Sequence, residues 1–195
     1  MNANSVSQPS LASANAFSAA DVEAILRERG WLTADATPEM EAWLGDAASL
    51  LGAQITARSV PPEDPRSMLR DLLSLIFFYD ARTLLEHVSN QTVMAREGAR
   101  EVIRELANLI LLFPASENVG LDSRRYQEVI ESLKTSLNFR GRELFHPIRF
   151  ALAGRAGEGE LDRVILLLDR AANLGFASPV KGTRQRMIEF CAALR

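Results

Sequence analysis

The segment MLRDLLSLIFFYD, residues 68–80, is apolar on most of its sides when it is placed on a helix. A helix with that pattern is buried, so this segment predicts the centre of a helical core. Three prolines within the preceding stretch SVPPEDPRS, residues 59–67, cannot continue a helix and predict a linker. Asp80 is expected to cap a further short helix, ARTLLEHV, at residues 81–88.

Towards the N-terminus, residues 18–29 open with Ser18 and Asp21 at capping-box spacing, and Gly30 ends the segment. A second helix should begin at Pro38, directly after Thr37. Before these helices, residues 1–16 are small and polar, with neither the basic region nor the apolar run of a targeting peptide, and we expect a disordered tail.

Downstream, apolar side chains recur with helical spacing from about residue 91 to 113, which predicts the longest helix of the chain, ended by Pro114. A loop at 114–121 and a helix at 122–137 should follow. β-branched residues nowhere alternate with polar ones. The sequence therefore predicts an all-α fold of two small helical bundles, with subdomains at residues 17–113 and 114–195.

Charge is distributed unevenly along the chain. Residues 1–97 carry 7 basic and 13 acidic side chains, whereas residues 134–195 carry 11 basic and 6 acidic ones. A polyanion would be drawn to the C-terminal part and repelled by the N-terminal part. The alternative interpretation is an ordinary solvated surface, because arginine is abundant throughout the chain.

The most specific segment is NFRGRELFHPIRFALAGRAGEGEL, residues 138–161. Pro147 suits the first turn of a helix that Gly154 ends, and the glycines that follow suit a flexible turn. Three arginines are expected near the ends of this helix, Arg142, Arg149 and Arg155, and Arg140 is also expected to bind RNA. Guanidinium groups gathered on one concave surface could hold phosphates or an unstacked base.

The run GRELFHPIRFALAGR closely resembles the C-terminal anticodon-binding region of glutamyl-tRNA synthetase, a class I aminoacyl-tRNA synthetase, and MLRDLLSLIFFYDARTLLEHV is similar to a helical step upstream in that region. The resemblance implies a helical cage that receives the tRNA anticodon loop. It implies that Arg149 meets the anticodon, and that Glu158 and Leu161 lie where the family approaches the anticodon bases.

Two departures from the family pattern favour an alternative function. The family threonine is Ala153 here, and the usual His-Gly-Pro turn is Gly157, Glu158, Gly159, so a hydroxyl is missing and a carboxylate has been added. Glu158 would repel phosphate unless it accepts a base amino group or pairs with an arginine. The alternative is a protein-interaction or structural domain that has lost tRNA binding on the same scaffold.

Catalytic signatures are missing from the sequence. With two histidines and two lysines, it has neither the His-Ile-Gly-His nor the Lys-Met-Ser-Lys-Ser motif of the synthetase, and it lacks phosphate-loop, dinucleotide and nucleophile-elbow motifs. We expect a non-enzyme without cofactor or metal. Its expected partners are tRNA, bound weakly, and a separate synthetase catalytic subunit or another protein. His146 is either a pairing or RNA-stacking residue or an ordinary packed or exposed one.

Two further observations bear on the expected cellular compartment. The single cysteine, Cys191, can form no intramolecular disulfide, which fits a reducing cytoplasm. No stretch reaches the roughly 18 consecutive apolar residues that a membrane span needs. We expect a cytoplasmic protein with no membrane partner.

Overall fold

The computed structural model describes residues 17–60, 62–112 and 120–194, and the regular structure in these ranges is entirely helical. This confirms the all-α class predicted from the sequence. The helices of the described residues are α1 (Ala19–Glu28), α2 (Pro38–Thr56), α3 (Pro65–Phe77), α4 (Ala81–Glu86), α5 (Val88–Met94), α6 (Ala99–Leu112), α7 (Ser123–Leu137), α8 (Gly141–Ala153), α9 (Glu160–Ala172) and α10 (Thr183–Ala193). The predicted tail at 1–16 and most of the predicted loop at 114–121 lie outside the described residues.

Short polar side chains begin five of these helices. Each accepts a hydrogen bond from a backbone amide one turn into the helix, which would otherwise lack a partner. These caps are Ser18, Thr37, Asp64, Asp80 and Asp122. At the first helix, the backbone amide of Ser18 also donates to the Asp21 carboxylate at 2.8 Å, so the predicted capping box is formed.

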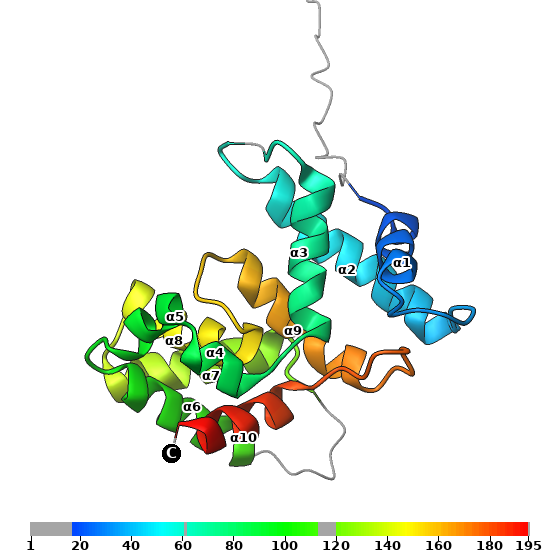
Figure 1. Ribbon diagram of the computed structural model, residues 1–195. Coiled ribbons are helices and arrows are strands. Elements are labelled where there is room, and N and C mark those ends of the chain that lie inside the picture. The colour runs from blue at the N-terminus through cyan, green and yellow to red at the C-terminus, as the bar shows by residue number, and fades with distance from the viewer. Residues whose placement is uncertain (1–16, 61, 113–119, 195) are drawn as a thin grey trace, which may run out of the picture.

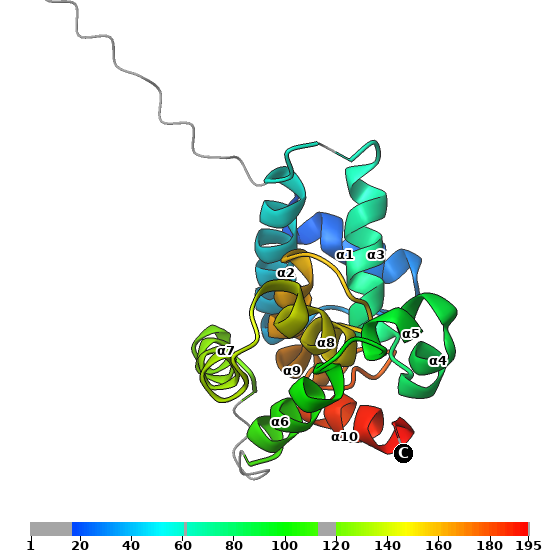
Figure 2. The same cartoon turned by 90° about the vertical axis from the view of Figure 1, so that its left-hand side faces the viewer.

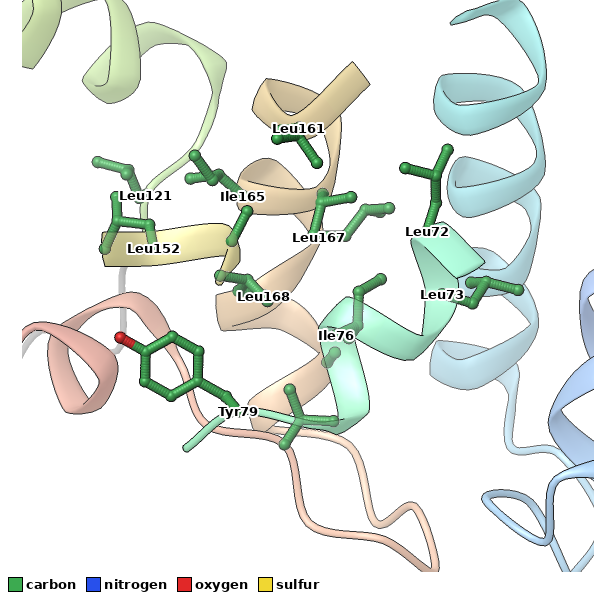
Figure 3. Packing of buried hydrophobic residues seen from close by; sticks show 14 of the residues in the cluster. Leu72, Leu73, Ile76, Tyr79, Leu121, Leu152, Leu161, Ile165, Leu167 and Leu168 are labelled. Carbon is green, nitrogen blue, oxygen red and sulfur yellow. The ribbon is translucent and has the colours of Figure 1, made fainter. Parts of the chain in front are cut away.

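The core forms where α3 and α9 lie side by side. Helix α9 packs against α2 and α3 on one side and against α8 on the other, and α10 returns to cover α4, α6 and α8 (Figure 1). Figure 3 shows the contact between α3 and α9, where Leu72 and Ile76 lie towards the leucines of α9. Helix α7 packs mainly against α6 and lies at the edge of the molecule (Figure 2).

Helices from both sides of residue 113 pack against one another. Helix α6 contacts α8 and α10, while α9 contacts α2 and α3. Their buried side chains belong to one hydrophobic cluster. The structure therefore does not divide the core at residue 113, where the sequence suggested a subdomain boundary.

The predicted long helix at 91–113 is wrong in one respect. The chain instead forms α5 and α6, separated by a turn at residues 95–98, and the longest described helix is α2, with 19 residues. The break lies at Gly98, whose φ of 79° is left-handed and favours glycine. A Cβ atom at this position would also overlap the Phe139 ring.

The predicted start of α8 at Pro147 is also wrong. The helix begins at Gly141, and Pro147 lies inside it. Proline has no amide to donate to the carbonyl of Glu143, four residues earlier. The side chain of Glu143 is exposed, so water can reach this part of the helix. Gly154 ends the helix with a left-handed φ of 81°, as the sequence predicts.

Arg186 is fully buried, and no carboxylate of the described residues forms an ion pair with it. Arg186 donates hydrogen bonds to the carbonyl oxygens of Ile76 at 2.6 Å, Leu152 at 2.8 Å and Lys181 at 2.9 Å. The first two carbonyls belong to the last turns of α3 and α8, which lack helical partners and carry partial negative charge. Burial lowers the pKa of Arg186 to about 10, so the side chain stays charged at neutral pH.

Candidate functional site

Arg149, the residue that the sequence placed at the centre of the site, is turned into the protein. Its guanidinium forms a two-point ion pair with Asp162, with Nε to Oδ1 at 2.8 Å and Nη2 to Oδ2 at 2.7 Å. Nη1 donates to the carbonyl oxygen of Gly157 at 2.7 Å. The side chain is 11% exposed. Arg149 thus fastens α8 to the first turn of α9 and to the glycine turn between them.

Tyr126 joins this network from α7. Its hydroxyl donates to Asp162 Oδ1 at 2.8 Å, and burial, followed by the charge of Asp162, raises the pKa of the phenol. Burial alone would lower the pKa of Arg149, but the hydrogen bonds and charge of Asp162 outweigh it and raise that pKa. Asp162 therefore organises three helices around one carboxylate.

The other predicted residues do not converge with Arg149. Leu161 is fully buried, and Figure 3 shows it among the core side chains of α9, so the expectation that it approaches a ligand is wrong. Arg142 and Arg155 are exposed near opposite ends of α8, a helix about 20 Å long. The single concave surface of arginines expected from the sequence is not formed.

Arg140 and Glu158 lie on the surface near the start of α8. Arg140 donates to the carbonyl oxygens of Lys134 at 2.7 Å and Phe139 at 2.8 Å, which closes the C-terminal end of α7. Glu158 approaches Arg142 to 3.9 Å, but both side chains are more than 70% exposed. An ion pair of that kind contributes little to stability.

A groove opens between α7 and α9, beside the network of Arg149, Asp162 and Tyr126. We call it the α7–α9 groove, and its volume is about 520 Å³. Its apolar lining includes Tyr126, Ile130, Phe145 and Leu166, and its charged lining comprises Glu131, Lys134, Asp162 and Arg163. A second hollow of about 390 Å³ meets it at Gln54 and Gly159. Volumes of this size are typical of small-molecule sites.

The sequence interpretation missed these groove residues and the partner of Arg149. One signal was present: Arg149 stands between Ile148 and Phe150 in an apolar helix, and a buried guanidinium needs an acceptor. The spacing of 13 residues to Asp162 follows no short helical repeat, so the pairing could be found only once the turn between the helices was known.

No match was found among protein-family models, curated proteins or solved structures. Within the described residues, no group of histidine, cysteine and carboxylate side chains has the arrangement needed to hold a metal ion. In the same part of the chain, none of the helices combines the length and apolarity required to cross a bilayer.

Proposed function

We propose that this chain is a non-catalytic RNA-binding module that receives unpaired nucleotides in the α7–α9 groove. The observation that supports it is the composition of that groove, in which the partly exposed ring of Phe145 lies beside the cations Lys134 and Arg163. Single-stranded nucleic acids are held by stacking on aromatic rings and by cations that follow the phosphates. Arg163 has no ion-pair partner among the described residues, so its charge is available to a ligand.

Two sequence features support this proposal. The basic excess of residues 134–195 lies in the part of the chain that supplies α8, α9 and much of the groove wall. The resemblance of the 138–161 segment to the anticodon-binding region of glutamyl-tRNA synthetase makes a tRNA the first candidate. In this proposal Arg149 shapes the groove instead of contacting the RNA. The single cysteine suits work in the cytoplasm.

A second candidate is a protein-interaction module that uses the same groove for an amphipathic helix of a partner. The acidic side chains Glu131 and Asp162 in the groove wall favour this alternative, since they would repel phosphate. The apolar floor between two helices also suits helix-in-groove recognition. A separate synthetase catalytic subunit is one partner of this kind.

Titration of the full chain into total tRNA, followed by gel shift at low and moderate salt, separates the two candidates. We expect binding at low salt that weakens as salt increases. The Lys134→Ala, Arg163→Ala double variant should bind at least about tenfold more weakly and show a salt slope lower by roughly one to two.

The matched control removes two cations from the far end of the molecule. Arg27 and Arg66, on α1 and α3, form exposed ion pairs, and their double alanine variant should bind RNA as the wild type does. Equal losses in both double variants, or no shift at low salt, would contradict RNA binding in the groove. A stoichiometric protein partner that survives nuclease treatment, and that the groove variant loses, would establish the second candidate.

A further inference from the structure

Three cationic or titratable side chains meet on the side of α8 next to the groove. Arg96, in the turn between α5 and α6, has its Nη1 atom 3.1 Å from Nδ1 of His146. Arg142 precedes His146 by four residues on α8, so the two side chains share one helix face. Packing of the Phe139 ring against Gly98 holds the two turns together.

The positive charge at this position is only weakly neutralised. Among the described residues, Arg96 has no carboxylate ion-pair partner, and Arg142 has only the exposed contact with Glu158. Burial lowers the pKa of His146, and the charges of Arg96, Arg142 and Arg149 lower it further, while Glu158 acts in the opposite direction. A neutral imidazole accepts at Nδ1 from Arg96, which places its proton on Nε2.

We propose that Arg96, Arg142 and His146 form a binding site for a phosphate group, separate from the α7–α9 groove. Two guanidinium groups supply the donors that phosphate oxygens accept. As an extension of the proposed RNA function, the occupant is a phosphate of an RNA strand whose bases lie in the groove. A bound anion would offset part of the positive charge of the two arginines and stabilise the protonated form of His146.

Proton binding and phosphate binding are therefore linked at this site. The bound anion raises the pKa of His146, so by reciprocity the affinity for the anion must rise as the pH falls through that pKa. The charged groups that face the imidazole are Arg96, Arg142, Arg149 and Glu158. Arg149 is already paired with Asp162, so the charges that a bound anion can offset are those of Arg96 and Arg142.

An NMR titration of the full chain between pH 5 and 8 tests the site without RNA. Sulfate is the probe because it keeps two charges over this range, whereas a phosphate monoester takes up a proton near about pH 6. We expect the titration midpoint of His146 to be higher in sulfate than in chloride of equal ionic strength. His87, the other histidine, serves as the reference in the same spectra.

Two variants distinguish a specific site from general screening. Arg96→Gln and Arg142→Gln should each raise the His146 midpoint in chloride and remove the difference between sulfate and chloride. Equal midpoints in both salts for the wild type, or equal upward shifts of His87 and His146 in sulfate, would overturn the site.

The phosphate site and the groove can fail independently. If sulfate raises the titration midpoint of His146 but no RNA binds, the anion site is supported and the proposed function is contradicted. If RNA binds in the groove but sulfate leaves the titration midpoint of His146 unchanged, the proposed function is supported and the anion site is contradicted. With both correct, the wild type binds RNA several-fold more tightly at pH 6 than at pH 8, and His146→Gln abolishes most of that dependence.

Discussion

Replacing Asp162 with asparagine should destabilise the domain strongly, although the shape of the side chain hardly changes. The variant keeps one acceptor for Arg149 but places an amide donor opposite the second guanidinium nitrogen. One to two charge-assisted hydrogen bonds are lost, at about 1.5–3 kcal/mol each. The guanidinium remains 11% exposed and without its counter-charge. Because Asp162 itself is 22% exposed and water can enter, we expect a loss of about 3 kcal/mol.

Urea unfolding and thermal unfolding followed by circular dichroism would measure this loss. For a chain of this length, about 3 kcal/mol corresponds to a decrease in Tm of roughly 6–12 °C. The matched partner variant is Arg149→Met, which removes the buried charge. The double variant should be no less stable than Asp162→Asn alone, since no unpaired guanidinium remains. Two results would show that the pair does not hold α8 to α9. One is a free energy of unfolding for Asp162→Asn within about 0.5 kcal/mol of the wild-type value, and the other is a double variant whose loss equals the sum of the two single losses.

Four other substitutions test features of the fold by the same unfolding measurements. Gly98→Ala should lower the free energy of unfolding by about 1–3 kcal/mol, because alanine disfavours the left-handed backbone and its Cβ overlaps Phe139. Gly45→Ala is the control: a Cβ at this position on α2 meets open space, so the substitution should raise the free energy of unfolding by about 0.5–1 kcal/mol. Trp43→Phe should cost about 2–3 kcal/mol, since the fully buried indole loses its 3.1 Å bond to a carbonyl of α9, and an unchanged Tm would argue against that bond. Arg186→Met should lower the free energy of unfolding by about 3 kcal/mol, because it leaves the carbonyls at the ends of α3 and α8 unpaired. A variant as stable as the wild type would contradict the role of these hydrogen bonds.

Local signals in the sequence predicted the helices well where side chain and backbone act within one turn. Ser18, Thr37 and Asp80 begin helices because each can reach a free amide close by, which requires no knowledge of distant residues. The break at Gly98 has no such local cause. A glycine within an apolar helical pattern is tolerated, and the break depends on the ring of Phe139, some 40 residues away.

The candidate site was less predictable for the same reason. The segment around residue 150 stands out in the sequence, but an arginine in such a segment can bind a ligand or a carboxylate of its own chain. Nothing near Arg149 in sequence decides between these roles, because Asp162 reaches it through the turn at Gly157. The α7–α9 groove could not be predicted from the sequence either, because its walls come from helices that meet only in the folded chain.

The position of Arg186 bears on how the chain is made. Its guanidinium supplies hydrogen bonds to the last turns of α3 and α8, yet it lies in α10, 110 residues after Ile76 and 34 after Leu152. During synthesis on the ribosome, those two helix ends emerge long before their donor does. Until α10 has left the ribosome, the nascent chain therefore exposes helix-end carbonyls and core surface that the folded protein buries.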